Sequence, residues 1–478
     1  MARGGAGRIR KVSRKASGMQ QPSPDRFLAA LASLLPPERL VTEPERLDAY
    51  RRDHAELVTP GWPIGAALPI ETAEVAAILR LATDYRIPIV PRGAGTGLAG
   101  GAAATEGAFI VSLTRMDRLL ELDPDDLVAV VQPGLLNGAL REAAAAHGLM
   151  YAPDPASFEI SSLGGNLATN AGGLRCLKYG VTREATLGLE VVLADGRVLR
   201  TGGRTVKQAA GYDLTALFVG SEGTLGIITE AILRLRPAPG PAATLVAFFD
   251  TLPAAGRAVA AIAAGGVAPA VLELLDRTTL RAVEARTPLG LDTAAAAMLL
   301  AQSDAPGAAQ QELEAIAEAC AAQGGRDIIT SRDPREAEWL MAARREALPA
   351  LERQGVTLLE DVAVPRRRVP DLLAAIEAIA AAHAVVIGTF GHAGDGNLHP
   401  TLVFPRGDAA ARGRAEAAAD AIMAAAVALG GTITGEHGVG LLKRHALPAS
   451  LDPVALATMH VLKVALDPWG ILNPGKAI

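Results

Sequence analysis

Cysteine is scarce in this chain: only Cys176 and Cys320 occur among 478 residues, and they lie far apart in the sequence. Two isolated cysteines exclude a disulfide-rich scaffold. They also leave no CxxC spacing for a redox pair or a cysteine-ligated zinc ion. We therefore expect both thiols to be free, as in proteins of a reducing compartment.

Aromatic residues, long apolar runs and an excess of basic residues are missing as well. Aromatics make up 3% of the chain, although 50% of its residues are hydrophobic, and alanine is abundant in the expected helices. No uninterrupted run of 18 apolar residues occurs, so the sequence predicts no transmembrane segment. The net charge of -5 and the pI near 6.0 argue against nucleic acid as a partner.

Acidic residues are absent before Asp25, whereas the same segment carries Arg3, Arg8, Arg10, Lys11, Arg14 and Lys15. Mitochondrial transit peptides have such a composition, but here no clear amphipathic face forms and glycines interrupt the segment. We expect residues 1–35 to be a disordered extension and lead-in, with Met19 as the true start of the protein. Unless the basic segment is a transit peptide, we expect a cytoplasmic bacterial protein, with peripheral contact at the inner face of the membrane as an alternative.

The length exceeds what one hydrophobic core usually supports, so we expect two domains or more. Apolar residues recur at helical spacing over 72–85. Strands are predicted at 87–90, 109–111, 127–131 and 189–193, with a hairpin turn at 194–196. These elements indicate an α+β domain over residues 36–237, and a break at Pro237, Pro239 and Pro241 marks its end.

A second α+β domain is predicted over residues 242–414, with strands on one side and helices on the other. Its strands are expected at 244–249, 271–275 and 327–330, and its helices at 254–264 and 308–322. Residues 415–478 contain two more helical patterns, at 415–429 and 453–466. We expect this C-terminal segment to return to the first domain.

The segment 91–102 reads PRGAGTGLAGGA and contains the literal string G-x-G-x-x-G at Gly95, Gly97 and Gly100. In a Rossmann nicotinamide site, a helix would start within these glycines. No helix can be placed here, because small, turn-like residues lead directly into the strand predicted at 109–111. The sequence instead favours two strands joined by a glycine-rich loop, whose backbone N–H groups wrap an anion without a helix dipole.

His392 and His399 are seven residues apart in HAGDGNLH, and the glycines between them allow a turn to bring both imidazoles together. With Glu436 of GEHGVG they form a two-histidine, one-carboxylate set that leaves open positions on a divalent cation. These ligands fit Zn2+, our first expectation, but also Mn2+ or Fe2+. A metal-only hydrolase would use the same set, and the alternative is that the histidines only satisfy buried loop backbone.

Six motifs, in order along the chain, resemble those of one flavoprotein family. They are PRGAGTGLAGGA (91–102), PDPASFEISSLGGNLATNAGG (153–173), GYDLTALFVGSEGTLGIITEAILRLRP (211–237), FGHAGDGNLHP (390–400), GEHGVG (435–440) and DPWGILNPGK (467–476). The first three resemble the flavin-binding domain of the vanillyl-alcohol oxidase type. The others resemble the FAD-dependent D-2-hydroxy acid dehydrogenases, a branch with D-lactate dehydrogenases, D-2-hydroxyglutarate dehydrogenases and the catalytic subunit of glycolate oxidase. The resemblance implies an α+β fold: a two-part flavin-binding domain, then an α+β substrate cap domain and a C-terminal helical segment.

The resemblance implies FAD as the cofactor, held by small residues, hydroxyls and amides. The implied FAD-binding residues are Pro91, Gly93, Gly95, Thr96, Gly97, Pro153, Asp154, Ser157, Gly165, Asn166, Asn170, Glu222, Gly223, Ile227, Ile228 and Asn473. Some relatives tether the flavin covalently through a histidine of the first loop. Here that loop contains Thr96 and Leu98 and neither histidine nor cysteine, so we expect the FAD to be non-covalent.

The resemblance makes His437 the general base that takes the hydroxyl proton of the substrate. Arg344 matches a carboxylate-binding arginine, with Arg345 as its alternative and a solvated helix arginine as the other interpretation. Lys443 is a further candidate for the site. An extended segment would point the side chains of His437 and Glu436 in different directions.

Two departures argue against a dicarboxylate substrate. D-2-Hydroxyglutarate dehydrogenases have a lysine shortly before an acidic-Pro stretch, where this chain has leucine in LLEDVAVP (358–365). They also have an asparagine where this chain has Thr401. We therefore expect a small 2-hydroxy acid, D-lactate first and glycolate next, with D-2-hydroxyglutarate as an alternative.

Oxidation of such an acid implies an electron acceptor, either a quinone, a cytochrome or an electron-transferring flavoprotein. An oxidase that passes electrons directly to O2 and a homodimeric assembly both stay open. A non-catalytic flavin-binding subunit is a third alternative, but it should lack the set of two histidines and one glutamate.

Overall fold

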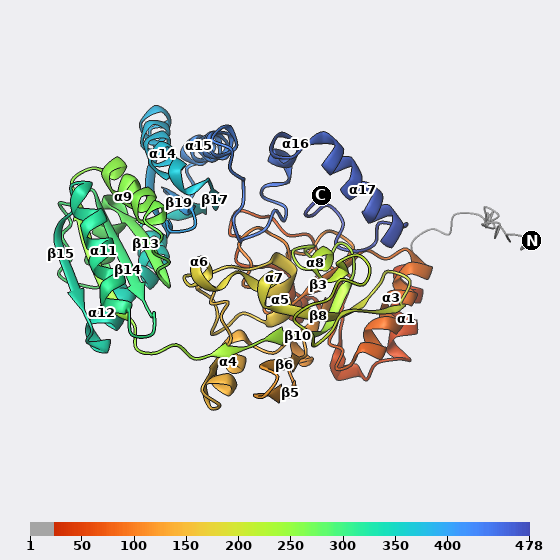
Figure 1. Cartoon of the computed structure of the whole chain (residues 1–478). Helices are drawn as coiled ribbons and strands as arrows, with labels where there is room; N and C mark the ends of the chain where they lie inside the picture. Colours follow the sequence, from red (N-terminus) through yellow and green to blue (C-terminus); the bar gives the residue numbers. More distant parts are fainter. Residues whose placement is uncertain (1–22) are drawn as a thin grey trace, which may run out of the picture.

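The computed structural model describes residues 23–478 (Figure 1). The predicted basic extension, as far as position 22, lies outside the described residues. Residues 24–32 do not belong to an extension. They form α1 (Pro24–Ala32), which packs against α3 (Thr72–Tyr85) and buries Phe27 and Leu31. The expected lead-in up to residue 35 thus contains a packed helix, because these two residues, four apart, give the helix an apolar side.

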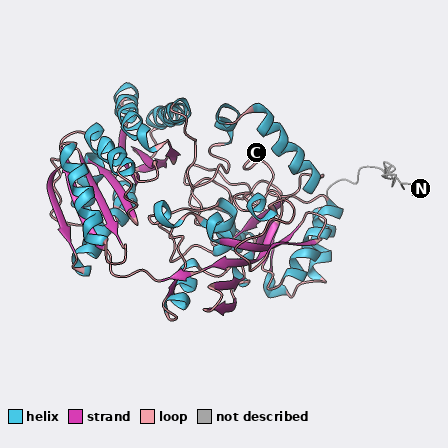
Figure 2. Ribbon diagram, viewed as in Figure 1, coloured by secondary structure: helices cyan, strands magenta, loops and turns pink. Residues whose placement is uncertain are grey.

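The first domain contains two main sheets (Figures 1 and 2). One has the order β1-β2-β4-β3 with a parallel core, and the other is antiparallel with the order β5-β6-β10-β8-β9. Their strands are β1 (Leu40–Val41), β2 (Gly65–Ala67), β3 (Ile89–Arg92), β4 (Phe109–Ser112), β5 (Leu119–Asp123), β6 (Val128–Val131), β8 (Thr186–Val192), β9 (Val198–Gly202) and β10 (Ile227–Arg234). A separate pair joins β7 (Leu149–Met150) and β11 (Arg236–Pro237).

Short helices surround these sheets. Besides α1 and α3 they are α2 (Pro44–Arg51), α4 (Asn137–Ala145), α5 (Leu163–Thr169), α6 (Cys176–Tyr179), α7 (Thr182–Ala185) and α8 (Leu214–Phe218). The helix predicted over 72–85 is confirmed as α3, and β3 lies two residues beyond the strand predicted at 87–90. No helix separates β3 from β4, so the glycine-rich loop joins two parallel strands as predicted.

The second domain is built on one large antiparallel sheet with the order β15-β12-β14-β13-β18-β19-β16, and β17 also pairs with β19. Its strands are β12 (Ala243–Phe249), β13 (Val271–Asp276), β14 (Ala297–Ser303), β15 (Arg326–Ser331), β16 (Val356–Leu359), β17 (Val362–Ala363), β18 (Val386–His392) and β19 (Asn397–Phe404). Leu245 and Phe249 face one core while Val246 and Phe248 face another, the alternation expected of a strand that is buried on both faces.

Helices cover both faces of this sheet, which corrects the expectation that they lie on one side only. One layer contains α9 (Leu252–Ala264), α11 (Ala309–Ala322), α14 (Val369–His383) and α15 (Ala409–Ala428). The opposite face carries α10 (Arg277–Arg286), α12 (Pro334–Arg345) and α13 (Ala347–Glu352). The predictions placed no helix at these last three segments.

The C-terminal segment divides between the two domains. Residues 415–428 of α15 pack against α14 and β19, so their expected return to the first domain is wrong. Residues after α16 (Leu447–Ser450) do return: Lys463 of α17 (Pro453–Leu466) donates to the carbonyl of Thr224, and Leu472 bridges to Ile89 of β3.

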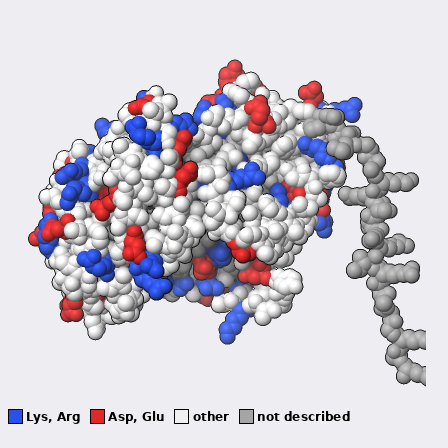
Figure 3. Space-filling model, turned by 90° about the horizontal axis from the view of Figure 1, so that it is seen from above, with Lys and Arg blue, Asp and Glu red and all other residues white. Residues whose placement is uncertain are grey.

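Several compositional predictions can be compared with the described residues. Cys176 and Cys320 are both free. None of the helices described within residues 23–478 combines the length and apolar character needed to cross a membrane. On the face shown in Figure 3, basic and acidic side chains are interspersed, and no continuous basic patch forms.

Candidate active site

A cavity of about 920 Å³ lies between the two domains and receives most of the predicted site residues. The first domain lines it with the loop after β3, the 154–175 segment and residues 221–228. The second domain contributes strand and helix residues around Arg344 and His392. Of the predicted FAD-binding residues, Pro153, Asn170 and Asn473 are not among those that line the cavity, and all the others are.

These three residues do not line the cavity but take part in hydrogen bonds beside the segments that line it. The Asn137 side chain donates to the carbonyl of Pro153, and Asn170 ends α5 and accepts the N–H of Arg183. Asn473 Nδ2 donates to the carbonyls of Gly101 and Glu222, which ties two of the flavin motifs together.

The glycine-rich loop is tied to the second flavin motif through Ser162. Its hydroxyl accepts the N–H of Ala94, and a Cβ on Gly93 would overlap the same oxygen. A Cβ on Gly97, in contrast, would meet only Asp53 Oδ2 at 3.8 Å, so this glycine leaves free space at the cavity wall. Close backbone approach at Gly97 is the feature that a cradled pyrophosphate or flavin ring needs, and the loop therefore fits FAD.

Glu222 has a structural task that its sequence motif does not reveal. Its carboxylate accepts the N–H groups of Val439 and Gly440 at 2.8 and 2.9 Å. Glu222 itself adopts a left-handed backbone conformation with φ of 51°. The third flavin motif thus positions the loop that carries Glu436 and His437.

The β18–β19 hairpin places His392 and His399 on one face of the sheet. Phe390 pairs directly with His399, and His392 lies two residues beyond Phe390, so all three side chains project the same way. Gly396 makes the turn between them with φ of 90°, where a Cβ would also collide with the Val364 carbonyl. The predicted turn is confirmed, and it brings both imidazoles to Glu436.

Glu436 Oε1 lies 3.2 Å from His392 Nε2 and 3.4 Å from His399 Nε2. Two ligands bound to a tetrahedral zinc ion at about 2.1 Å are themselves separated by roughly 3.4 Å. The Glu436 oxygen therefore lies, from each of the two histidine nitrogens, at the distance that separates two donors on one cation. All three side chains are largely buried, which suits a site that must hold a charged ion away from bulk water.

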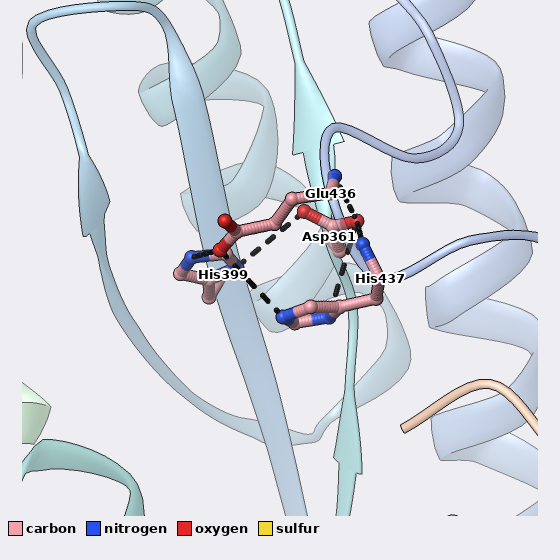
Figure 4. Close-up of side chains that lie close together, drawn as sticks. All are labelled: Asp361, His399, Glu436 and His437. Carbon is pink, nitrogen blue, oxygen red and sulfur yellow. Dashed lines mark hydrogen bonds and ion pairs between the residues drawn. The ribbon is translucent and has the colours of Figure 1, made fainter. Parts of the chain in front are cut away.

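Asp361, His399, Glu436 and His437 form a second compact group, with one donor atom of each within 4.8 Å of the others (Figure 4). Asp361 is already saturated, however. Its Oδ2 accepts from Thr434 Oγ1 and from the backbone N–H groups of Gly435, Glu436 and His437, and its Oδ1 accepts from Asn397. Asp361 thus shapes the turn that presents Glu436, and His392 is the better third donor.

The ionisable side chains of this cluster shift one another's pKa values. Burial would raise the pKa of Glu436, but His392 and His399 hold it well below its usual range. Burial opposes a charged His392, yet Glu273 and Glu436 raise its pKa well above the ordinary value. Burial, helped by repulsion from His437, lowers the pKa of His399 to about 4.

His437 lies beside the ligand atoms, and its side chain approaches the same Glu436 carboxylate oxygen instead of pointing away from it. Its ring stacks on that of His399 with centroids 5.0 Å apart and planes 12° from parallel. Nδ1 is 3.9 Å from Asp361 Oδ2, and Nε2 is 3.8 Å from Glu436 Oε1. Both distances exceed a hydrogen bond, so the ring nitrogens make no bond to these carboxylates.

Arg344 and Arg345 both line the cavity, but Arg344 is buried, whereas Arg345 is half-exposed and pairs with Glu338. The Nε of Arg344 donates to Glu273, and its guanidinium lies 4.8 Å from the Phe390 ring centroid. Its two Nη groups have no hydrogen-bond partner within the described residues, which leaves them for a carboxylate. Lys443 does not line the cavity; it is buried beside Glu360 at 3.2 Å.

Sequence reasoning missed Glu273 and the anchoring role of Asp361. Glu273 is fully buried in β13, within an otherwise apolar run, VLELL. A lone acid in a buried strand is the signal that could have found it, because Glu is almost never fully buried unless paired. Its partners lie far along the chain and could not be named from the sequence.

The fold and this cavity define an FAD-linked oxidoreductase. Residues 63–202 match the family described as FAD binding domain, and residues 238–477 match that described as FAD linked oxidases, C-terminal domain. The chain belongs to the FAD-linked oxidase family.

Named relatives cover nearly the whole chain. It is 45% identical to the glycolate oxidase subunit GlcD of Bacillus subtilis, over 91% of this chain and 94% of the relative. It is 35% identical to a D-lactate dehydrogenase of Anaerostipes hadrus, over 92% of this chain and 94% of the relative. The predicted membership of the branch that contains these enzymes is confirmed.

Solved structures confirm the predicted flavin fold of the vanillyl-alcohol oxidase type. The chain resembles p-cresol methylhydroxylase with a TM-score of 0.79 and 18% identity, over 95% of this chain and 96% of that one. It resembles a 4-ethylphenol oxidase of Gulosibacter chungangensis with a TM-score of 0.78 and 22% identity, over 95% and 96% of the two chains. At these identities the similarity concerns the fold alone.

Proposed function

We propose that the chain oxidises a short D-2-hydroxy acid, D-lactate in the first place, to the 2-oxo acid. The observation that carries this proposal is the meeting, in one cavity, of a buried arginine, a three-donor cation site and the glycine-lined flavin wall. A 2-hydroxy acid offers one partner to each: a carboxylate to Arg344, a hydroxyl to the cation and a C2 hydrogen to the flavin.

Arg344 would bind the substrate carboxylate through its two Nη groups, in the bidentate geometry that guanidinium favours. Phe390 packs under the guanidinium, and Glu273 fixes its Nε. The side chain therefore loses little freedom when the carboxylate arrives.

His437 would accept the hydroxyl proton at Nε2. It lies next to the donor cluster, and its Nδ1 is 3.9 Å from Asp361 Oδ2. Both rings line the cavity, and the side chain of His437 is more exposed than that of His399.

His392, His399 and Glu436 would hold a divalent cation, which lowers the pKa of the substrate hydroxyl when bound. Bound FAD would supply the acceptor for the hydride of C2. The loop at Gly93, Gly95 and Gly97 and the second motif around Gly165 would hold it without a covalent tether, since no histidine or cysteine occurs in the loop.

The cavity favours a short acid over a dicarboxylate. Leu359 lines it, and the resemblance places a lysine of the D-2-hydroxyglutarate dehydrogenases in this leucine-containing stretch. Thr401 is fully buried, and its hydroxyl donates to the carbonyl of His399, so it is not available to a substrate. Leu359 and Phe390 offer apolar contact to a methyl group.

Glycolate is the second candidate, favoured by the relative of 45% identity that is named a glycolate oxidase subunit. Both acids are tested by one experiment: anaerobic mixing of the FAD-loaded protein with a panel of D- and L-2-hydroxy acids, followed by flavin absorbance. We expect bleaching by D-lactate and glycolate, and none by L-lactate. Fastest bleaching by D-2-hydroxyglutarate would contradict the proposal.

A second measurement addresses the cation. Removal of divalent metal with a chelator should abolish bleaching and leave FAD bound, because the donor atoms belong to the second domain and to the turn at 436. His399→Ala should resemble the chelated protein. Unchanged bleaching in metal-free protein would overturn the metal role and leave the flavin role intact.

A further inference from the structure

Glu273 connects two parts of the cavity that have different tasks. One carboxylate oxygen, Oε1, is 2.8 Å from His392 Nδ1, and the other accepts from Arg344 Nε. Glu273 is fully buried, and both partners are more than nine-tenths buried.

The strands place this carboxylate. In the β13–β18 pairing, Leu274 faces Gly391 and Leu275 faces Phe390, so Glu273 lies opposite His392. Arg344 reaches the same carboxylate from α12, on the face of the sheet that borders the cavity. The contact therefore depends on rigid elements rather than on a mobile loop.

The hydrogen bond determines which nitrogen of His392 faces the cation site. When Nδ1–H donates to Glu273, the lone pair is at Nε2, which points to Glu436 at 3.2 Å. A carboxylate in this position also makes the imidazole a better donor to a cation. Arg344 binds the same carboxylate, and its positive charge offsets part of the negative charge that Glu273 presents to His392.

We propose that Glu273 is a positioning residue that couples the cation site to the carboxylate-binding arginine. It orients His392 for the cation, and the charge of Arg344 limits how strongly it does so. A substrate carboxylate that binds Arg344 neutralises the guanidinium, leaves more of the Glu273 charge to His392 and strengthens cation binding. By linkage, a bound cation strengthens carboxylate binding to the same extent. This inference rests on the proposed function.

The test is a titration of Zn2+ into metal-free, FAD-loaded protein against a chromogenic chelator, with no substrate present. Glu273→Gln keeps the shape of the side chain and removes its charge, and we expect the Kd for Zn2+ to rise roughly 10–100-fold. Asp276→Asn is the matched control. It changes a buried carboxylate of the same strand that caps α10 through Thr279 and touches neither His392 nor Arg344. Its Kd should equal that of the wild type.

Two variants of Arg344 keep the test decisive if Glu273→Gln does not fold. Arg344→Met should bind Zn2+ several-fold more tightly than the wild type, since the whole charge of Glu273 then serves His392. Arg344→Lys retains the charge and should leave the Kd unchanged. A purely structural role would weaken Zn2+ binding in both.

The failures of the inference and of the proposed function are distinguishable. A wild type that binds Zn2+ and oxidises the acid, with Glu273→Gln binding Zn2+ equally well, overturns the coupling alone. Zn2+ binding by Arg344→Met no tighter than that of the wild type does the same. A wild type that binds no Zn2+ and bleaches fully after chelation overturns the metal role, and the coupling with it.

Discussion

Asp361 holds the backbone of His437: its Oδ2 accepts the His437 N–H at 2.8 Å and lies 3.9 Å from the Nδ1 of the same residue. The same oxygen accepts the N–H groups of Gly435 and Glu436. Burial would raise the pKa of this carboxyl, but His437 and Lys443 hold it far below its usual range. One buried carboxylate thus keeps the turn closed.

Asp361→Asn should therefore open this turn. An amide cannot accept all of these bonds, and each bond to a charged acceptor contributes about 1.5–3 kcal/mol. We expect a lower unfolding free energy in denaturant titrations and a loss of both Zn2+ binding and turnover, with FAD still bound. Thr434→Val removes a single donor to Asp361 and should have a milder effect. An Asp361→Asn protein with normal Zn2+ affinity would show that the turn needs no anchor.

Gly172 should tolerate no side chain, although its motif belongs to the flavin wall. A Cβ there would overlap Glu436 Oε2, so Gly172→Ala should displace a cation donor. We expect FAD content to be preserved and Zn2+ affinity and turnover to fall. Gly203→Ala, at a position with no neighbour within 4 Å of the added Cβ, is the control and should match the wild type. Loss of FAD without loss of Zn2+ binding in Gly172→Ala would contradict this expectation.

Glu436 and His437 are adjacent, yet their variants should differ in kind. Glu436→Ala removes a cation donor, so metal content should fall together with activity. His437→Ala should retain metal and FAD and lose kcat by roughly the 10²–10⁴ of a missing general base, with a residual rate that rises with pH. Metal analysis beside steady-state kinetics measures both. If His437→Ala lost its metal and Glu436→Ala kept it, the two roles would be exchanged.

The FAD should dissociate when the protein is denatured. The first loop contains neither histidine nor cysteine, so no side chain of this loop can tether the isoalloxazine. Acid precipitation should release the yellow colour into the supernatant, where absorbance quantifies it. Colour that stays with the pellet would reveal a covalent link outside this loop.

Lys476 should give stability a measurable dependence on pH. Burial lowers the pKa of this ammonium group to about 8 from an ordinary value of 10.5. Between these values the unfolded form of this side chain binds more protons than the folded form, so its contribution to the unfolding free energy should rise with pH across this window. The rise should be smaller in Lys476→Met, measured by denaturant titration at successive pH values. Equal slopes in the two proteins would contradict the lowered pKa.

Local sequence patterns predicted helices and loops correctly where the residues of the segment itself determine its conformation. The helix over 72–85 follows from apolar spacing, and the absence of a helix after Gly95 follows from the small residues there. The assignment of α15 failed for a physical reason. Its alanine-rich faces could pack on many surfaces, and only the partner, α14, decides which domain receives it.

The site was predictable as far as its residues lie in short motifs. His392 and His399 meet across one hairpin, so their spacing was informative. Glu273 lies 119 residues from His392, and nothing local links them. The sequence shows that Asp361 is acidic, but it does not predict that this side chain anchors the turn, since its hydrogen bonds reach backbone groups 74 to 76 residues further along.

Residues 472–476 complete the wall around the glycine-rich loop, and this has a consequence for how the protein is made. Asn473 bonds to the carbonyl of Gly101 across 372 positions, and Lys476 bonds to the carbonyl of Ala103 across 373. A ribosome that has finished the first domain has therefore not yet delivered the residues that close its cofactor pocket. We therefore expect nascent chains stalled before Leu472 to bind FAD more weakly than chains that include residues 472–476.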